Sequence, residues 1–140
     1  MRKNQRKLYG FQTTNRAKHN LKVHLILVCK YRKKLLVGDI NILIKDTICE
    51  IESKSDFDII EMESDIDHIH IMLQYIPRVS ISSIVNRIKS ITTHRVWKNH
   101  SHYLQKHFWK EKTFWTDGYF VCSVGEASPE TIQNYIANQG

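Results

Sequence analysis

The chain has 140 residues, the size of one domain that can bury a core of its own. Its 21 Lys and Arg residues outnumber its 14 Asp and Glu residues, and the formal net charge is +7. This excess of positive charge indicates an anionic partner, with nucleic acid the first to consider and a membrane surface the second. Membrane-spanning and secreted proteins are not expected, because no apolar run approaches roughly 20 residues and residues 1–20 lack the apolar centre of a signal peptide.

The cysteines indicate a reducing compartment. Cys29, Cys49 and Cys122 form no C-x-x-C pair and stand in unrelated apolar surroundings. An odd number of cysteines with these spacings is typical of reduced core thiols. We therefore expect a cytoplasmic protein that has neither a disulfide framework nor a cysteine-based zinc site.

The first part of the chain divides at residue 20. Residues 1–20 predict a basic arm, either solvated or in contact with phosphates, and residues 21–140 predict one folded domain. Residues 23–31 are mostly apolar and β-branched, which predicts a strand buried on both faces. Between Asp39 and Lys54 apolar residues recur every three or four positions, which predicts a helix with Asp39 as its N-cap.

The middle of the chain predicts a hairpin followed by a helix. Residues 57–62 and 68–75 have strand character, with a turn at 65–67, so the second strand should lie inside the sheet. Ser80 then begins a helix with an apolar stripe up to Ile91. The polar residues 98–112 predict a long connection.

The last part predicts one more strand and a helix. Residues 114–124 favour a strand with Gly118 as a bulge. Ser128 followed by Pro129 is typical of a helix start. The order β-α-β-β-α-β-α predicts an α+β fold, a ferredoxin-like split βαβ with an antiparallel sheet and helices on one face.

The sequence Asp-His-Ile-His-Ile, residues 67–71, carries the clearest chemical signal. On a strand His68 and His70 share a face and are about 6.6 Å apart along the chain, so their imidazoles can converge on one ion. Neutral imidazole is a common ligand of divalent metals. A His-x-His motif alone is more often a pair of solvated side chains than a metal site.

The final helix carries a second candidate pair. Tyr135 and Gln139 are four residues apart and therefore lie on one helix face. Considered on its own, Tyr135 is an ordinary amphipathic residue beside the apolar stripe of Ile132 and Ile136. Its significance depends on the histidine strand.

With both pairs in view, the chain resembles the single-tyrosine HUH transposases of the IS200/IS605 insertion-sequence family. In that name, HUH denotes two histidines around a hydrophobic residue, which is Ile69 here. The resemblance covers roughly residues 20–140 and rests on Val23–Lys33, Asp67–Ile71, Val79–Ser90, Tyr119–Gly125 and Tyr135–Gln139.

The resemblance implies a DNA strand transferase that acts on single-stranded DNA at insertion-sequence ends. By the pattern of the family, Tyr135 would be the nucleophile and would form a 5′-phosphotyrosine link. His68, His70 and Gln139 would hold a divalent metal ion, Mg²⁺ or Mn²⁺, and Mn²⁺ accepts nitrogen ligands more readily.

The resemblance also implies partners. Family members recognise DNA hairpins at transposon ends and are homodimers in which the tyrosine helix of one subunit can serve the histidines of the other. Residues 125–128 would be the joint that allows this exchange. We expect five cations to contact phosphates: Lys30, Arg32, Lys33, Arg87 and Lys89.

Two other functions remain open at this point. One is a hairpin-binding protein that has kept the fold and the basic surface without catalysis. The other is a related tyrosine nickase that acts on replication origins or chromosomal palindromes, which would share every catalytic residue. Only the DNA substrate would separate the nickase from a transposase.

Overall fold

A computed structural model describes residues 12–13, 18–19, 21–125 and 128–139 of the chain. Within the expected N-terminal arm, β1 (Gln12–Thr13) pairs with β2 (Lys18–His19) in antiparallel orientation. The rest of residues 1–20 lies outside the described residues.

The main sheet has four antiparallel strands, as the sequence predicts. They are β3 (Leu21–Val28), β4 (Phe57–Ser64), β5 (His68–Tyr75) and β6 (Phe120–Ser123), in the order β4-β5-β3-β6. Strand β5 pairs with β4 on one side and β3 on the other, which confirms that the histidine strand lies inside the sheet.

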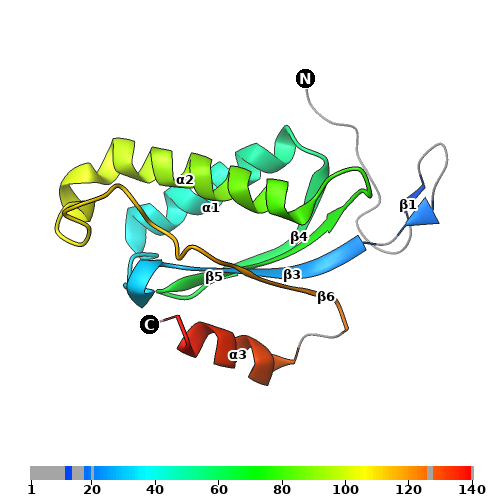
Figure 1. The fold of residues 1–140 in the computed structure, drawn as a ribbon. Helices are drawn as coiled ribbons and strands as arrows, with labels where there is room; N and C mark the ends of the chain where they lie inside the picture. The colour runs from blue at the N-terminus through cyan, green and yellow to red at the C-terminus, as the bar shows by residue number, and fades with distance from the viewer. Residues whose placement is uncertain (1–11, 14–17, 20, 126–127, 140) are drawn as a thin grey trace.

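Helices cover both faces of this sheet (Figure 1). Helices α1 (Gly38–Ser53) and α2 (Ile81–Leu104) pack on one face, and α3 (Pro129–Ala137) lies alone on the other. The predicted α+β fold is confirmed. We expected the helices on one face of the sheet, and this is true of α1 and α2. Helix α3 takes the opposite face because β3 is apolar on both sides. Leu25 and Leu27 join the large core, and Ile26 and Val28 pack with α3.

Strand β3 ends earlier than predicted. After Cys29 the chain makes a short 3₁₀ turn, η1 (Lys30–Arg32), in which Tyr31 and Arg32 have φ of 59° and 53°. Such left-handed conformations cost about 1–2 kcal/mol for residues other than glycine, so tertiary contacts must hold this turn.

Helix α1 differs from the prediction at its N-cap. Val37 takes that position, and Asp39 lies in the first turn, where its carboxylate still faces the positive end of the helix.

Helix α2 is much longer than predicted. It runs through Leu104, so the connection expected at 98–112 begins only after that residue. The apolar stripe continues with the buried side chains of Val96, Trp97 and Leu104, and this burial outweighs the polar residues between them. Among the described residues, no helix combines the length and the apolar character that a membrane crossing requires.

The predicted strand at 114–124 is shorter in the structure. Only Phe120–Ser123 forms β6, while Trp115 makes an isolated bridge to Cys29. Gly118 lies in the irregular segment between them and not in a strand bulge. None of the three cysteines forms a disulfide, but Cys49 is exposed, so the prediction that it lies in the core is wrong.

Ser80 is the N-cap of α2, as predicted, and its hydroxyl accepts a hydrogen bond of 3.2 Å from the backbone N–H of Ser83. We expect Ser80→Ala to lower the free energy of unfolding by about 1 kcal/mol, because the first turn loses this acceptor. Chemical denaturation would measure the loss. Ser90→Ala, on an exposed position inside the same helix, is the control and should not destabilise the protein. Equal effects of the two substitutions would contradict this role.

Candidate functional site

The histidine pair lies on the face of the sheet that α3 covers. Ile69, Ile71 and Leu73 point into the large core on the opposite side and are fully buried. Since side chains alternate along a strand, His68 and His70 take the α3 side, where both are partly exposed. This confirms that the two imidazoles share one face.

His68 is held by the residue that precedes it. Its Nδ1 lies 2.8 Å from Oδ1 of Asp67, and the other carboxylate oxygen accepts a 3.3 Å hydrogen bond from Nε of Arg32. Burial tends to raise the pKa of Asp67, but the hydrogen bonds from His68 and Arg32 outweigh it and leave this pKa below its ordinary value. A carboxylate accepts hydrogen bonds only, so Nδ1 of His68 carries a proton and Nε2 is the nitrogen left to bind a metal ion.

His70 is held by a third histidine. Nε2 of His70 lies 2.7 Å from Nδ1 of His24 on β3, and the ring centroids are 4.9 Å apart. Burial lowers the pKa of His70, and the neighbouring His24 lowers it further, so the imidazole is neutral at physiological pH. A neutral ring is the form that binds a metal ion.

The donor chemistry fits a divalent metal ion with open positions. The site offers two imidazoles. A carboxylate lies behind His68, which is a usual surrounding of metal-binding histidines, and a third histidine lies behind His70. Within the described part of the chain, no cluster of three or more His, Cys, Asp and Glu side chains is arranged to hold a metal.

Tyr135 lies over a different strand. Its ring packs on Phe120 of β6 with centroids 5.4 Å apart, and it contacts the small core formed by Ile26, Val28 and Ile136. A Cβ placed on Gly118 would be 3.9 Å from the Tyr135 hydroxyl. Strand β3 lies between β6 and the histidine strand β5, and the described residues show no hydrogen bond or ring contact between Tyr135 and His68 or His70.

The Tyr135 hydroxyl is buried, and no hydrogen bond of ordinary geometry joins it to the described residues. Burial raises its pKa, and a loose hydrogen-bonding contact with the Thr116 side chain lowers it in part. A buried hydroxyl without a partner is unfavourable, so such groups usually have a functional explanation. Tyr135 is therefore protonated at neutral pH.

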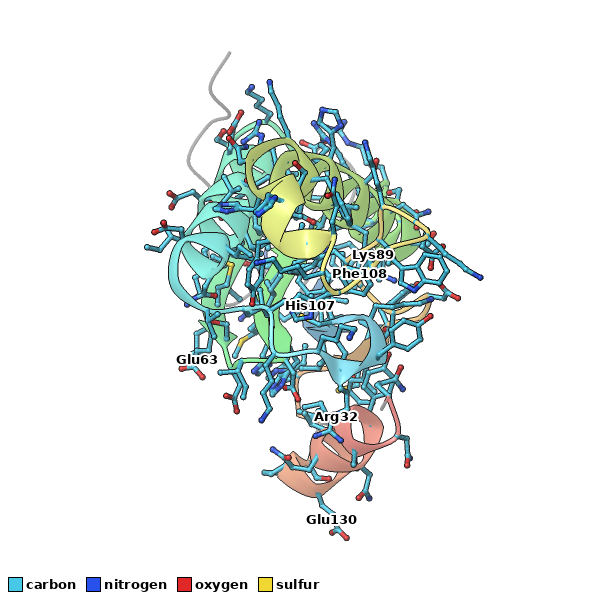
Figure 2. All side chains as sticks on the ribbon, turned by 90° about the vertical axis from the view of Figure 1, so that its left-hand side faces the viewer. Arg32, Glu63, Lys89, His107, Phe108 and Glu130 are labelled. Carbon is cyan, nitrogen blue, oxygen red and sulfur yellow. The ribbon has the colours of Figure 1, made fainter. Side chains whose placement is uncertain are left out.

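The C-terminal end of α3 lies near the end of the sheet at which Asp67 and His68 begin strand β5. Asn138 is the C-cap and Gln139 follows it, so Gln139 lies just beyond the helix on which it was predicted. Arg32 links the two regions, because Nη1 of the same guanidinium that contacts Asp67 donates to the carbonyl oxygen of Ala137 at 3.5 Å. Figure 2 shows Arg32 between the sheet and α3. The described residues contain no hydrogen bond between the Gln139 amide and His68 or His70.

The predicted phosphate-binding cations have protein partners in the structure. Lys30 pairs with Asp117 at 3.3 Å, Lys33 lies over the ring of Phe108, and Arg87 donates to Ser55 at 2.7 Å.

Lys89 is the most constrained of these cations. Its ammonium donates to the carbonyl oxygens of Thr116, Asp117 and Gly118 at 2.7, 3.1 and 2.8 Å. These bonds use the three donors of a lysine ammonium. Contact of any of the five predicted cations with DNA stays a prediction.

A cavity of about 760 Å³ lies between α2 and the segment before β6. Its lining includes Lys89, Lys98 and Lys112, together with Trp97 and Trp115. The two tryptophans are almost fully buried, and their indole N–H groups donate to Thr113 and Thr92. Sequence reasoning did not connect these residues, because 98–112 was predicted to be a loop.

Sequence reasoning also missed His24 and Asp67 as parts of the site. Asp67 could have been found, since it directly precedes His68 and a carboxylate beside a histidine is a common orienting group. His24 could be found only from the register, which places it on the neighbouring strand.

Comparisons with known proteins agree with this architecture. The family model described as "Transposase IS200 like" matches residues 17–139. The ISDra2 transposase TnpA of Deinococcus radiodurans is 30% identical over 121 residues, which cover 86% of this chain and 85% of that protein. The transposase for insertion sequence element IS200 of Salmonella typhimurium is 28% identical over 120 residues, with 86% and 77% covered.

Solved structures share the fold. A crystal structure of a Deinococcus radiodurans protein assigned as a transposase has a TM-score of 0.83 and 27% identity, covering 91% of this chain and 97% of that one. A REP-associated tyrosine transposase bound to a REP hairpin has a TM-score of 0.57 and 12% identity, covering 97% and 68%.

Proposed function

The chain belongs to the family of IS200-like transposases, and we propose that it cleaves and rejoins single-stranded DNA at insertion-sequence ends through a covalent 5′-phosphotyrosine link. One observation carries the proposal. Two oriented imidazoles share a face of the sheet with a buried tyrosine hydroxyl that lacks a hydrogen bond of ordinary geometry. Packing alone explains neither feature.

The proposed chemistry uses few groups. The Tyr135 oxygen attacks the scissile phosphorus, a P–O bond to tyrosine forms, and the bond to the 3′ oxygen breaks. The tyrosine proton is lost and the leaving oxygen gains a proton, so a free 3′-hydroxyl results. Attack by the 3′-hydroxyl of another end reverses the step and rejoins the strands. A divalent ion, Mg²⁺ or Mn²⁺, held by His68, His70 and Gln139 would stabilise negative charge on the phosphate.

Tyr135 must reach a histidine pair for this chemistry. In one chain β3 separates the two, so we propose a homodimer in which α3 serves the histidines of the other subunit. Gly125 has a φ of 101°, and the joint expected at 125–128 includes two residues outside the described ones. A mixture of Tyr135→Phe and His68→Ala proteins should regain cleavage as heterodimers. Failure of the mixture would contradict the exchange.

We also propose that the DNA carries hairpins, because a structural relative was solved with a REP hairpin. Unlike Lys30 and Arg32, Lys33 and Arg87 form no ion pair with a carboxylate among the described residues. Replacing both with Ala should lower the slope of log K against log salt concentration by about 0.7 for each contact with single-stranded phosphate that is lost.

Fluorescence anisotropy titrations at several salt concentrations would measure this slope. The control is a protein with Lys45→Ala and Lys54→Ala on α1, which loses the same charge. Identical slopes for the two double variants would mean that Lys33 and Arg87 do not contact DNA phosphates.

A denaturing gel tests the proposed reaction. The protein is incubated with labelled single-stranded DNA that carries the end of its element, in Mn²⁺, in Mg²⁺ and in chelator. We expect a shifted protein band that needs metal and is labelled only when the label lies 3′ of the nick. Binding without cleavage in either metal would favour the silent hairpin-binding protein, and cleavage only of origin or palindrome DNA would favour the nickase.

A further inference from the structure

The contact between His24 and His70 extends the proposed site to a third histidine. We propose that His24 is a positioning residue of the metal site, in which its Nδ1 accepts a hydrogen bond from the Nε2–H of His70. This inference rests on the proposed function, because it takes His70 to be a metal ligand. The bond is 2.7 Å long and joins two neighbouring strands of the sheet, so it is well placed to fix the orientation of His70.

The register of β3 and β5 places His24 on the correct side of His70. His24 lies opposite Met72, two residues beyond His70 in the direction away from His68. The rings of His24 and His70 therefore meet on the side of His70 that is remote from His68. An ion shared by His68 and His70 would therefore be held from the other side of the His70 ring, where His24 would not compete for it.

The direction of the hydrogen bond follows from the valence of a neutral imidazole. Each neutral ring has one N–H and one lone pair. If His24 donated the bond, His70 would carry its own proton on Nδ1, and neither of its nitrogens would be free for a metal. His70 must therefore donate through Nε2, and its Nδ1 keeps the lone pair. In His68 the roles of the two ring nitrogens are reversed, because Nδ1 bonds to Asp67 and Nε2 is left for the metal ion.

His24 acts through His70 and is not a third ligand. The described residues contain no arrangement of three His, Cys, Asp and Glu side chains that could hold a metal, although His24, His68 and His70 share a face. Removal of an outer partner of a metal-binding histidine typically weakens metal affinity 10- to 100-fold. We expect an effect of that size, which is smaller than the loss of a ligand.

Isothermal titration of the full-length protein with Mn²⁺ tests the role without reference to cleavage. His24→Leu should weaken Mn²⁺ binding about 10- to 100-fold, since Leu removes the acceptor and keeps an apolar side chain in place. His24→Gln should recover most of the affinity, because its amide oxygen can accept the same hydrogen bond. His94→Leu, at an exposed position on α2, is the matched control and should leave affinity unchanged.

Long-range ¹⁵N–¹H NMR of the metal-free protein gives a second, independent readout. His70 should carry its proton on Nε2 in the wild type and become a mixture of tautomers in His24→Leu. A His70 proton on Nδ1 in the wild type would overturn the inference, whatever the fold of the variants. Unchanged Mn²⁺ affinity in His24→Leu would also overturn it, as would a loss as complete as that of His70→Ala. If the wild type binds no Mn²⁺, the proposed metal site itself fails, which is a different result.

Discussion

Tyr135→Phe is expected to abolish the covalent protein–DNA adduct and to lower cleavage by at least about 10⁴-fold, the scale of losing a nucleophile. The fold should not suffer. The hydroxyl makes no hydrogen bond of ordinary geometry within the described residues, so its removal takes away a poorly satisfied buried polar group. The Phe ring can keep the contacts with Phe120 and the small core. Adduct gels would measure the first effect, and thermal unfolding should show an equal or slightly higher Tm.

Tyr119→Phe is the matched control for this experiment. Tyr119 is close in sequence to β6, but its side chain packs against the large core under α1 and α2. Its hydroxyl is on the wrong face of the sheet to meet the histidines. This variant should form adduct at the wild-type rate. An adduct that persists in Tyr135→Phe, or disappears equally in Tyr119→Phe, would mean that Tyr135 is not the nucleophile.

Lys89→Met is expected to lower the free energy of unfolding by about 2–3 kcal/mol, the scale of hydrogen bonds to a charged group. Lys89 ties α2 to the segment before β6 through the carbonyls of Thr116, Asp117 and Gly118. Burial lowers the pKa of this ammonium, so the bonds form at a desolvation cost that Met does not have. Met keeps the length of the apolar stem, and the loss can be assigned to the ammonium. Urea denaturation followed by tryptophan fluorescence would measure it.

Arg87→Met is the control, since Arg87 is two residues away on the exposed side of α2 and bonds only to Ser55 among the described residues. It should change stability by less than about 1 kcal/mol. Because Gly118 lies beside the Tyr135 hydroxyl, Lys89→Met should also loosen the surroundings of Tyr135. If Lys89→Met alters only the salt dependence of DNA binding and leaves stability unchanged, the lysine contacts phosphate instead.

Local sequence patterns predicted correctly those features that depend only on residues close to one another along the chain. Strand β5 was predicted with its observed bounds, because a run with apolar residues at alternate positions, Ile69, Ile71 and Leu73, is bounded by a turn and by Pro77. The caps Ser80 and Ser128 were predicted correctly, since a cap bonds to a backbone N–H only three residues away.

The predictions failed where burial overrules local polarity. Residues 98–104 look like a loop, yet they continue α2 because Trp97 and Leu104 are covered by the segment that follows. Strand β3 was predicted to reach Tyr31, but the chain turns after Cys29. The backbone N–H groups of Cys29 and Lys30 bond to Asp67 and Phe114, which are distant in sequence.

The sequence by itself determined the order of elements, the α+β class, the shared face of His68 and His70, and the family resemblance. Each depends on the period of side chains along a strand or helix, or on spacing along the chain. Only the tertiary structure decided that α3 covers the face opposite to α1 and α2, that β3 separates Tyr135 from its own histidines, and that His24 supports His70. These relations join residues from different elements, and they follow from strand register and packing, which no local pattern contains.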